Sequence, residues 1–240
     1  MRMRKKKNGA ARLLAAASVL LDKPAEPMTD PSLAMNGQGG TVFLEIGAGK
    51  GGFAAEMSKR NPDASYFAME RVSDCVVLAA ELAIKTAEER EDNLRFIVDT
   101  ADNLLDYFAA GTVDRIFLNF SDPWSKKGYA KRRLTHRRYL ALYLNLLKEG
   151  GRLVFKTDNV GLFDFSLEEI SEIGLSAAIV TRDLHSSEWN EGNVMTEYET
   201  AFSSQGIKIN MLTLEKPVGF SVDIPEDFTR KIEITKKLAE

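Results

Sequence analysis

The hydrophobic positions of this chain follow two alternating patterns. Short runs rich in β-branched and aromatic residues predict strands at about 41–46, 65–69, 94–98, 113–119 and 151–156. Between these runs, apolar residues recur with helical spacing near 52–60, 72–89, 102–109, 135–148 and 160–173. Strands that alternate with helices in this way predict an α/β fold, namely a doubly wound, Rossmann-like parallel sheet.

Two more strand-like runs follow, at 176–182 and 196–202, with no helical pattern between them. We therefore expect the sheet to close with a C-terminal antiparallel strand pair. The pattern divides the chain into a basic N-terminal arm and linker at 1–40, a main domain at 41–217 and a tail at 218–240, which reads as a helix or a loose segment.

The N-terminus resembles a signal peptide only superficially. The run MRMRKKK is followed by an apolar stretch at 13–21, but that stretch is short, begins beside Arg12 and ends without an A-x-A cleavage site. A short amphipathic helix is the simpler interpretation. No other stretch reaches membrane-spanning length, so we expect a cytoplasmic protein without membrane association.

Composition narrows the chemistry further. The chain has 240 residues, 44% of them hydrophobic, which fits one domain with a sizeable core. Cys75 is the single cysteine, so no internal disulfide can form and zinc-binding spacing is absent; we expect no metal.

A glycine-rich turn follows the first strand in LEIGAGKGGF, at 44–53. Gly47 and Gly49 fit both a nucleoside turn and, with Gly52, the dinucleotide spacing G-x-G-x-x-G, so the glycines alone leave the cofactor open. Glu45 favours S-adenosylmethionine, because a carboxylate at the mouth of the crevice suits an ammonium group and disfavours a pyrophosphate. Glu70, at the end of the second strand, is placed to accept both ribose hydroxyl groups.

The third strand ends where an adenine is expected to lie. An acid in the turn at 98–102 could accept the exocyclic amino group, and backbone amides could meet a ring nitrogen. Asp102 is better interpreted as an acid in the first turn of the next helix.

The stretch NFSDPWSKKGYAKRRLTHRR, at 119–138, concentrates positive charge in a chain of net charge −3. Asp122 follows the fourth strand, and Pro123 fixes the turn in which it lies. Trp124 offers a face on which an extruded base could stack. The cations of this run are Lys126, Lys127, Lys131, Arg132, Arg133, Arg137 and Arg138. A local positive patch beside an acid predicts a nucleic-acid substrate.

Four ordered motifs together resemble the bacterial tRNA (guanine-N7)-methyltransferases, a family of class I S-adenosylmethionine-dependent enzymes. They are LEIGAGKGGF, NFSDPWSKKGYAKRRLTHRRYL, FKTDN at 155–159 and TEYETAF at 196–202, and the likeness runs from about residue 41 to 206. The basic N-terminus is similar as well. The family pattern has an acid directly before Ala101. This chain has Thr100 there, with Asp99 one place earlier. The contact with the adenine could therefore come from a side chain or from the backbone of this turn.

The resemblance implies a set of site residues. Asp122 is the catalytic candidate and also a cofactor contact. The other cofactor contacts implied are Glu45, Gly47, Gly49, Glu70, Asp99, Thr100 and Ala101. The substrate contacts implied by the resemblance or by the basic run are Lys126, Lys131, Arg132, Arg133, Asp158, Thr196, Glu197, Tyr198 and Glu199.

The expected reaction is methyl transfer from S-adenosylmethionine to N7 of a guanine in tRNA, in the variable loop by resemblance. Asp122 would stabilise positive charge on the purine, and Asp158 would hold the edge of the base. Lys156 reads as a phosphate contact or an edge residue, and His136 and His185 have no acid partner at a telling spacing. The partner is tRNA, with no obligatory protein partner, and a homodimer is compatible with the family.

Three alternatives remain open at this point. The first is methylation of another RNA base. The second is a nicotinamide-dependent oxidoreductase, which the glycine spacing permits. The third is a non-catalytic RNA-binding protein on the same scaffold.

Overall fold

A computed structural model of the chain describes residues 6–35, 40–89 and 91–229. In these residues one sheet has seven strands in the order β3-β2-β1-β4-β5-β7-β6. The strands are β1 Thr41–Ile46, β2 Ala64–Glu70, β3 Leu94–Val98, β4 Val113–Asn119, β5 Leu147–Thr157, β6 Ile179–Thr181 and β7 Asn210–Glu215. The first five are mutually parallel, whereas β7 is antiparallel to both β5 and β6. The predicted doubly wound sheet with a C-terminal antiparallel pair is confirmed.

Helices cover both faces of the sheet. They are α1 Gly9–Ala15, α2 Gly52–Arg60, α3 Ser73–Lys85, α4 Arg137–Leu146, α5 Val160–Glu172 and α6 Glu197–Ser203. Alternate residues of β1 separate the two layers, since Phe43 packs in the core under α2 and α3, and Leu44 packs in the core under α4 and α5. The predicted helix at 102–109 is instead a 3-10 helix, Ala101–Asp106.

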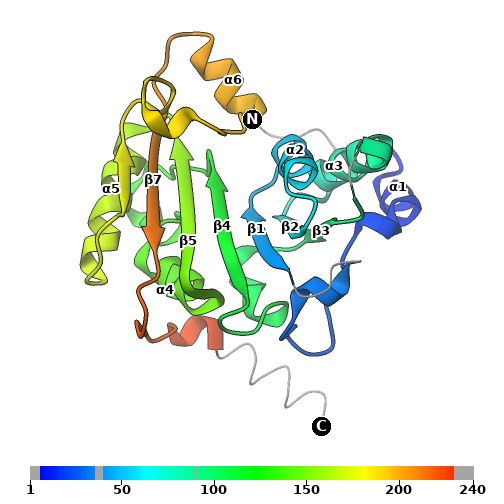
Figure 1. The fold of residues 1–240 in the computed structure, drawn as a ribbon, viewed down its shortest axis with the longest axis horizontal. Helices are drawn as coiled ribbons and strands as arrows, with labels where there is room; N and C mark the ends of the chain where they lie inside the picture. The colour runs from blue at the N-terminus through cyan, green and yellow to red at the C-terminus, as the bar shows by residue number, and fades with distance from the viewer. Residues whose placement is uncertain (1–5, 36–39, 90, 230–240) are drawn as a thin grey trace.

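One predicted strand is wrong. The segment 196–202 forms α6, and the strand that pairs with β5 is β7, further along the chain. Thr196 explains the difference, because its side chain accepts a hydrogen bond from the backbone N–H of Glu199 and so caps the helix. Tyr198 and Phe202 satisfy the strand period of two and also lie four residues apart, where helical side chains meet. Figure 1 shows α6 beyond the arrowheads of β4 and β5.

The N-terminal segment packs against the sheet at the β3 edge. The predicted amphipathic helix is α1 followed by a 3-10 turn, and Arg12 forms a bidentate pair with Glu81 of α3 at 2.7 Å. Leu20 bridges Phe96 of β3, and Val19 is buried. The basic residues 1–5 lie outside the described residues. Among the described residues, no helix combines the length and the apolar character needed to cross a membrane.

The C-terminal segment packs at the opposite end of the sheet from α6 (Figure 1). Phe228 is buried against Tyr139 of α4, with ring centroids 5.5 Å apart. Asp227 forms an ion pair with Arg138 at 3.1 Å. Residues 230–240 of the predicted tail lie outside the described residues.

Candidate cofactor and substrate site

The candidate site lies where the strand order reverses, between β1 and β4. At such a point the chain leaves the two neighbouring strands toward opposite faces of the sheet, so a crevice forms beyond their carboxyl ends, and ligands of doubly wound sheets bind there. Ile46, the last residue of β1, lies opposite Leu118, one residue before the end of β4. The loops that follow these two strands therefore line one crevice.

The loop after β1 is the glycine turn. Gly47 and Gly49 have φ angles of 84° and 56°, and a Cβ on either would meet no atom within 4 Å, so both expose backbone to open space. Gly51 has another role: a Cβ there would lie 2.7 Å from that of Ala79, so this glycine lets α2 pack against α3. The turn thus offers an open backbone surface on a fixed support.

Glu70 connects the glycine turn to the start of α3. Its Oε2 accepts a hydrogen bond from the N–H of Gly49 at 3.0 Å, and its Oε1 accepts one from Val72 at 2.8 Å. The side chain is 9% exposed. Each carboxylate oxygen has a second lone pair, so Glu70 can still accept the two hydroxyl groups of a ribose.

Glu45 lies deeper than the sequence predicts. It is 2% exposed, below the mouth of the crevice, and accepts a hydrogen bond from Asn119 Nδ2 of β4 at 3.1 Å and a longer one from the Tyr66 hydroxyl at 3.5 Å. Burial raises the pKa of Glu45 to about 7; the negative charge of Glu197 adds to the rise, and Asn119 and Lys156 oppose it. The Glu45 carboxylate thus has fewer hydrogen-bond donors around it than its charged form requires.

Two buried polar atoms, one at the end of β4 and one in the loop that follows it, strengthen this conclusion. Within the described structure, Asn119 Oδ1 and Ser121 Oγ have no hydrogen-bond partner. Buried polar atoms are rarely left without one, so both atoms, with the Glu45 carboxylate, fit a ligand group that carries several N–H donors. A primary ammonium has three.

Asp99 shapes the turn after β3. Its Oδ1 accepts hydrogen bonds from the Thr100 N–H and the Asn103 side chain, both at 2.7 Å, and its Oδ2 accepts one from the Tyr107 hydroxyl at 2.9 Å. Which atom of residues 99–101 would contact an adenine stays a prediction. Asp102 is a first-turn acid as expected, and it pairs with Arg138 at 3.0 Å.

The loop after β4 presents Asp122 to solvent. The Asp122 side chain is 66% exposed, and its nearest cation is Arg71, at 3.3 Å. Arg133 donates hydrogen bonds to the backbone oxygens of Pro123 and Trp124, at 2.9 and 3.2 Å, and these bonds restrain the turn that contains Asp122. Arg133 was predicted to contact substrate, but in the structure its guanidinium holds the turn.

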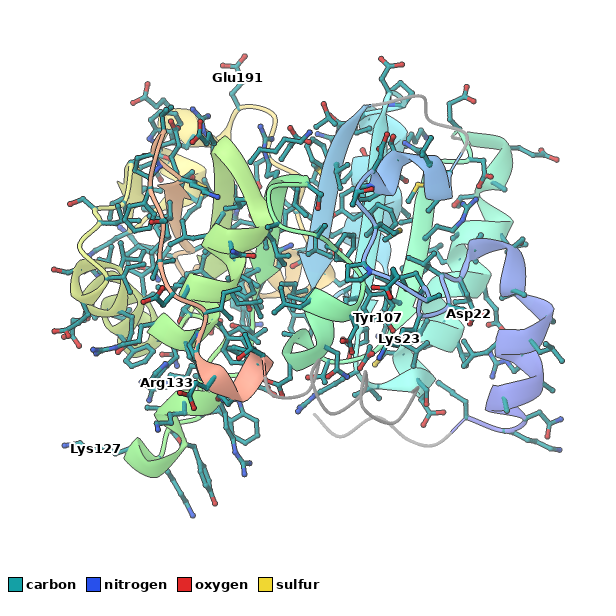
Figure 2. All side chains as sticks on the ribbon, turned by 90° about the horizontal axis from the view of Figure 1, so that it is seen from below. Asp22, Lys23, Tyr107, Lys127, Arg133 and Glu191 are labelled. Atoms are coloured by element: carbon teal, nitrogen blue, oxygen red, sulfur yellow. The ribbon has the colours of Figure 1, made fainter. Side chains whose placement is uncertain are left out.

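The cations after Asp122 differ in what their side chains contact. Arg137 and Arg138 form ion pairs with protein carboxylates, and Arg132 lies over the rings of Trp124 and Tyr129, 5.1 and 4.7 Å from their centroids. The exposed lysines are Lys126, Lys127 and Lys131. Figure 2 shows Lys127 pointing away from the body of the molecule, on the same protruding segment as Arg133. The cations presented to a partner are therefore the three lysines and the exposed Arg132.

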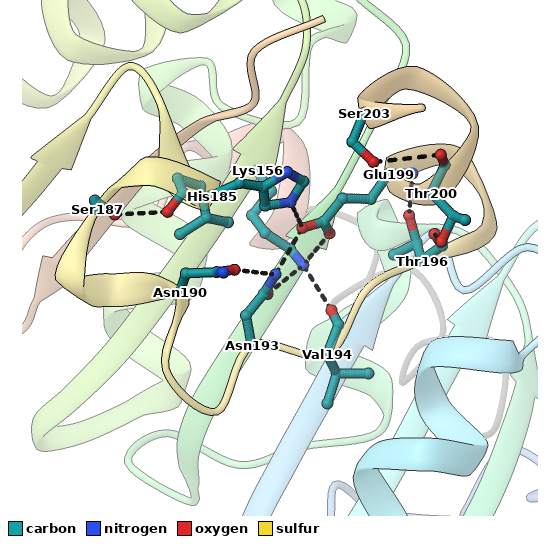
Figure 3. A network of polar contacts seen from close by, with 11 residues as sticks. Lys156, His185, Ser187, Asn190, Asn193, Val194, Thr196, Glu199, Thr200 and Ser203 are labelled. Carbon is teal, nitrogen blue, oxygen red and sulfur yellow. Dashed lines mark hydrogen bonds and ion pairs between the residues drawn. The ribbon is translucent and has the colours of Figure 1, made fainter. Parts of the chain in front are cut away.

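A buried polar network anchors α6 to the end of β5 (Figure 3). Lys156 Nζ donates to Glu199 Oε2 at 2.6 Å and to the backbone oxygen of Val194 at 2.9 Å. The other oxygen of Glu199 binds Asn193 Nδ2 at 2.7 Å and His185 Nε2 at 2.9 Å. Burial alone would raise the pKa of Glu199, but Lys156, His185 and Asn193 together hold it below its usual range.

This network corrects two interpretations of the sequence. Lys156 is 2% exposed and pairs with Glu199, so it is neither a phosphate contact nor an edge residue. His185 does have an acid partner, Glu199, at 2.9 Å. His136 Nδ1 lies 3.7 Å from Glu169 but accepts a hydrogen bond from the N–H of Arg138. The spacing along the chain does not reveal the contacts of Lys156 and His185 with Glu199.

The predicted substrate segment 196–199 is split between interior and surface. Thr196 caps α6 and Glu199 is 0% exposed, so neither side chain reaches the surface in this structure. Tyr198 is 58% exposed. Glu197 is exposed too, and its Oε1 would lie 2.8 Å from a Cβ on Gly52, which places it against the start of α2. Asp158 is half-buried, between β5 and α5.

A family model described as "Putative methyltransferase" matches residues 40–212. The chain belongs to this methyltransferase family. It is the family of the tRNA (guanine-N7)-methyltransferases, so the resemblance found in the sequence is confirmed. Class I methyltransferases of this kind use S-adenosylmethionine, which excludes the nicotinamide alternative.

Solved structures show the same fold. The chain is similar to a 16S rRNA methyltransferase, KamB, with a TM-score of 0.56 and 14% identity over 89% of this chain and 95% of that one. It is also similar to an antibiotic-related methyltransferase, with a TM-score of 0.55 and 17% identity over 73% and 87% of the two chains. At these identities the likeness concerns the fold alone.

The residues of the crevice fit S-adenosylmethionine. Glu45 and Asn119 Oδ1 would hold its ammonium group, which supplies the missing donors, and Glu70 would accept its ribose hydroxyl groups. The open backbone of Gly47 and Gly49 leaves room between these two carboxylates. The acceptors of this methyltransferase therefore match the ammonium and ribose groups of the cofactor.

Replacing Glu45 with Gln should change how stability depends on pH. The folded-state pKa of about 7 lies above the ordinary value of 4.5, so the unfolded chain loses this proton first as pH rises. The free energy of unfolding of the wild type should therefore fall by about 3 kcal/mol between pH 4.5 and 7 relative to Glu45→Gln. Urea unfolding across this range measures it. Glu168→Gln, at an exposed position, is the control, and parallel curves for wild type and Glu45→Gln would contradict the assignment.

Breaking the buried ion pair should destabilise the fold strongly. Lys156→Met leaves Glu199 charged and buried without its main partner, which typically costs about 3–5 kcal/mol. The double variant Lys156→Met, Glu199→Gln should recover part of that loss. Arg182→Met, which breaks an exposed pair with Asp164, should change little. Denaturant unfolding compares the variants, and equal effects of Lys156→Met and Arg182→Met would refute the role of the network.

Proposed function

We propose that this methyltransferase transfers a methyl group from S-adenosylmethionine to N7 of a guanine in tRNA. The observation that carries the proposal is the exposed Asp122, fixed by Arg133 in a turn beside the cofactor crevice and followed by exposed lysines. Family membership supports the reaction type. The exposed lysines support a polyanionic substrate.

The chemistry makes positioning the main task of the protein. S-adenosylmethionine supplies the methyl group on a sulfonium, and guanine N7 attacks with a lone pair that carries no proton. The chain therefore needs no general base in the site. Holding the reacting atoms in line can contribute about 7–11 kcal/mol to the lowering of the barrier.

Asp122 has the charge that this reaction calls for. N7 methylation leaves a positive charge on the purine, and a fixed carboxylate near the ring stabilises that charge as it develops. The turn restrains Asp122, since Pro123 limits the backbone and Arg133 holds the oxygens of residues 123 and 124. Arg71, 3.3 Å from Asp122, lies where it could also meet a phosphate.

The remaining contacts are assigned to the rim of the site. Lys126 and Lys131 would meet phosphates, and Asp158, at the end of β5, would hold the edge of the base. Tyr198 and Glu197 are the members of the 196–199 segment exposed for direct contact. Thr196 and Glu199 would act through the position of α6.

One experiment separates the proposal from its alternatives. The protein is incubated with total tRNA and S-adenosylmethionine labelled in the methyl group, and the digested nucleosides are separated. Label in 7-methylguanosine supports the proposal. Label in another nucleoside supports a methyltransferase of a different RNA base, and bound but unlabelled tRNA supports a non-catalytic RNA-binding protein.

Replacing Asp122 with Asn should slow methyl transfer without weakening tRNA binding. The variant keeps the shape of the side chain but loses its charge, so single-turnover transfer should fall about a hundred- to a thousand-fold. Affinity for tRNA, carried mainly by phosphate contacts, should stay within a few-fold. Asp164→Asn is the matched control, because Asp164 is also a solvent-accessible acid paired with an arginine, with its side chain 48% exposed. A near wild-type rate for Asp122→Asn would make this acid a turn-forming residue only.

Replacing Lys127 and Lys131 with Ala should reduce the salt dependence of tRNA binding. Each lost phosphate contact lowers the slope of log K against log salt by about 0.7–0.9. The control replaces Lys85 and Lys148, which lie at the end of α3 and the start of β5. Both positions are at the amino ends of the strands, away from the crevice at their carboxyl ends. Filter binding at several salt concentrations gives the slopes. The same slope in both double variants would show that the exposed lysines are bystanders.

A further inference from the structure

Three aromatic rings gather between the end of β4 and α6. Phe120 and Tyr198 are stacked, with centroids 6.4 Å apart and planes within 21°. Phe202 lies 6.1 Å from Phe120 and 6.4 Å from Tyr198. We call these three residues the aromatic platform. It joins two segments that are nearly eighty residues apart in the sequence.

The backbone of Phe120 is held in a conformation that bulky residues avoid. Its φ angle is 52°, in the left-handed region. The N–H of Phe120 donates to the backbone oxygen of Lys156 at 2.9 Å, so β5 keeps the residue in place. Conformations of this kind are concentrated at functional sites, where the surrounding structure enforces them.

The platform borders the cofactor crevice and Asp122 at once. Phe120 directly follows Asn119, which binds Glu45, and precedes Asp122 by two residues. Tyr198 stands between Glu197, which lies against the start of α2, and Glu199, which the buried network anchors. A ring set in this place lies beside the groups assigned to the reaction.

The core explains part of the platform but not all of it. Phe120 and Phe202 pack against a small buried cluster that contains Leu184 and Ile209. Tyr198 does not belong to that cluster, and it is 58% exposed. Tyr198 is thus a large aromatic side chain that stacks on a strained residue and is nevertheless exposed to solvent. Packing in the core does not account for its position, whereas contact with a ligand would.

Trp124, which the sequence favours for stacking, is less available. Tyr129 meets its ring edge to face at 5.9 Å, and Arg132 lies over it. Both contacts use parts of the surface on which a base would lie. The platform offers an alternative on the same rim.

We propose that Tyr198, supported by Phe120 and Phe202, is the surface on which the target purine stacks when it enters the site. The proposal rests on the proposed function, since the purine is the guanine to be methylated. Every base has a π face, and a methylated purine also has a positive charge, which favours an aromatic neighbour. Asp122 would then meet the edge of the same ring.

The test uses Tyr198, because an exposed side chain can be changed without disturbing the core. Tyr198→Phe keeps the ring, and Tyr198→Leu keeps an apolar side chain without a π face. Trp189→Leu is the control, since Trp189 is another exposed aromatic residue, 43% exposed, outside the platform. For each variant, kcat and KM for tRNA are measured, with the affinity for S-adenosylhomocysteine as a check on the cofactor crevice.

Tyr198→Leu should lose about 5- to 150-fold in kcat/KM for tRNA, the range expected when stacking on one base is lost. Tyr198→Phe and Trp189→Leu should stay near the wild type, and S-adenosylhomocysteine should bind all variants alike. Wild-type kcat/KM in Tyr198→Leu would overturn the platform. Equal losses in Tyr198→Phe and Tyr198→Leu would do so too, because they would assign the effect to the hydroxyl group.

A second readout separates this proposal from the proposed function. Binding of guanosine 5′-monophosphate to the protein saturated with S-adenosylhomocysteine is followed by the NMR shift of the purine H8 proton, which moves upfield above an aromatic ring. The shift should appear with the wild type and Tyr198→Phe and vanish with Tyr198→Leu. If wild-type protein labels no tRNA but gives this shift, the proposed function fails and the platform stands. No shift with the wild type overturns the platform.

Discussion

The ion pair between Lys156 and Glu199 determines how the second half of this molecule is arranged. Both side chains are almost fully buried, and a buried charge is tolerated only with an opposite charge and further hydrogen bonds. Those bonds come from two further segments, one at His185 and one at the adjacent residues Asn193 and Val194, so the requirement to satisfy this buried ion pair brings 184–203 onto the end of β5. The position of α6, and with it the exposed face of Tyr198, follows from this pairing.

Two buried glutamates at the same edge of the sheet have opposite electrostatic properties. Glu199 has an ammonium, an imidazole and an amide as partners, and its pKa is lowered. Glu45 has one amide at hydrogen-bond distance and a more distant phenol, and burial raises its pKa to about 7. The number of donors explains the difference, because only hydrogen bonds and opposite charge offset the loss of water around a carboxylate. Glu45 is thus the acid that a cationic ligand would complete.

The basic run at 126–138 contains cations that stabilise the fold and cations that are exposed to a partner. Three of its four arginines bind protein oxygens: Arg133 holds those of the Asp122 turn, Arg137 binds Glu169 and Arg138 binds Asp102. Arg132 is exposed and lies over the rings of Trp124 and Tyr129. Its lysines are exposed. The planar fork of a guanidinium suits fixed, paired contacts, whereas an ammonium on a flexible stem is strongly hydrated and suits a surface that meets phosphates. Net charge along a run therefore overstates the number of cations presented to a partner.

The sequence by itself determined the layered fold, the glycine turn and the location of Asp122, because each depends on residues close together in the chain. Strands and turns follow from local periodicity and from Gly and Pro, and the carboxyl ends of parallel strands meet by topology alone. Only the tertiary structure decided that 196–202 is a helix, since a period of two and a spacing of four fit the same residues. Only it showed that Lys156 meets Glu199 and that Asn119 meets Glu45, because these partners are 43 and 74 positions apart and no local pattern links them. Burial is likewise a property of the assembled molecule, and it decides whether a polar side chain holds the fold together or is exposed to contact a ligand.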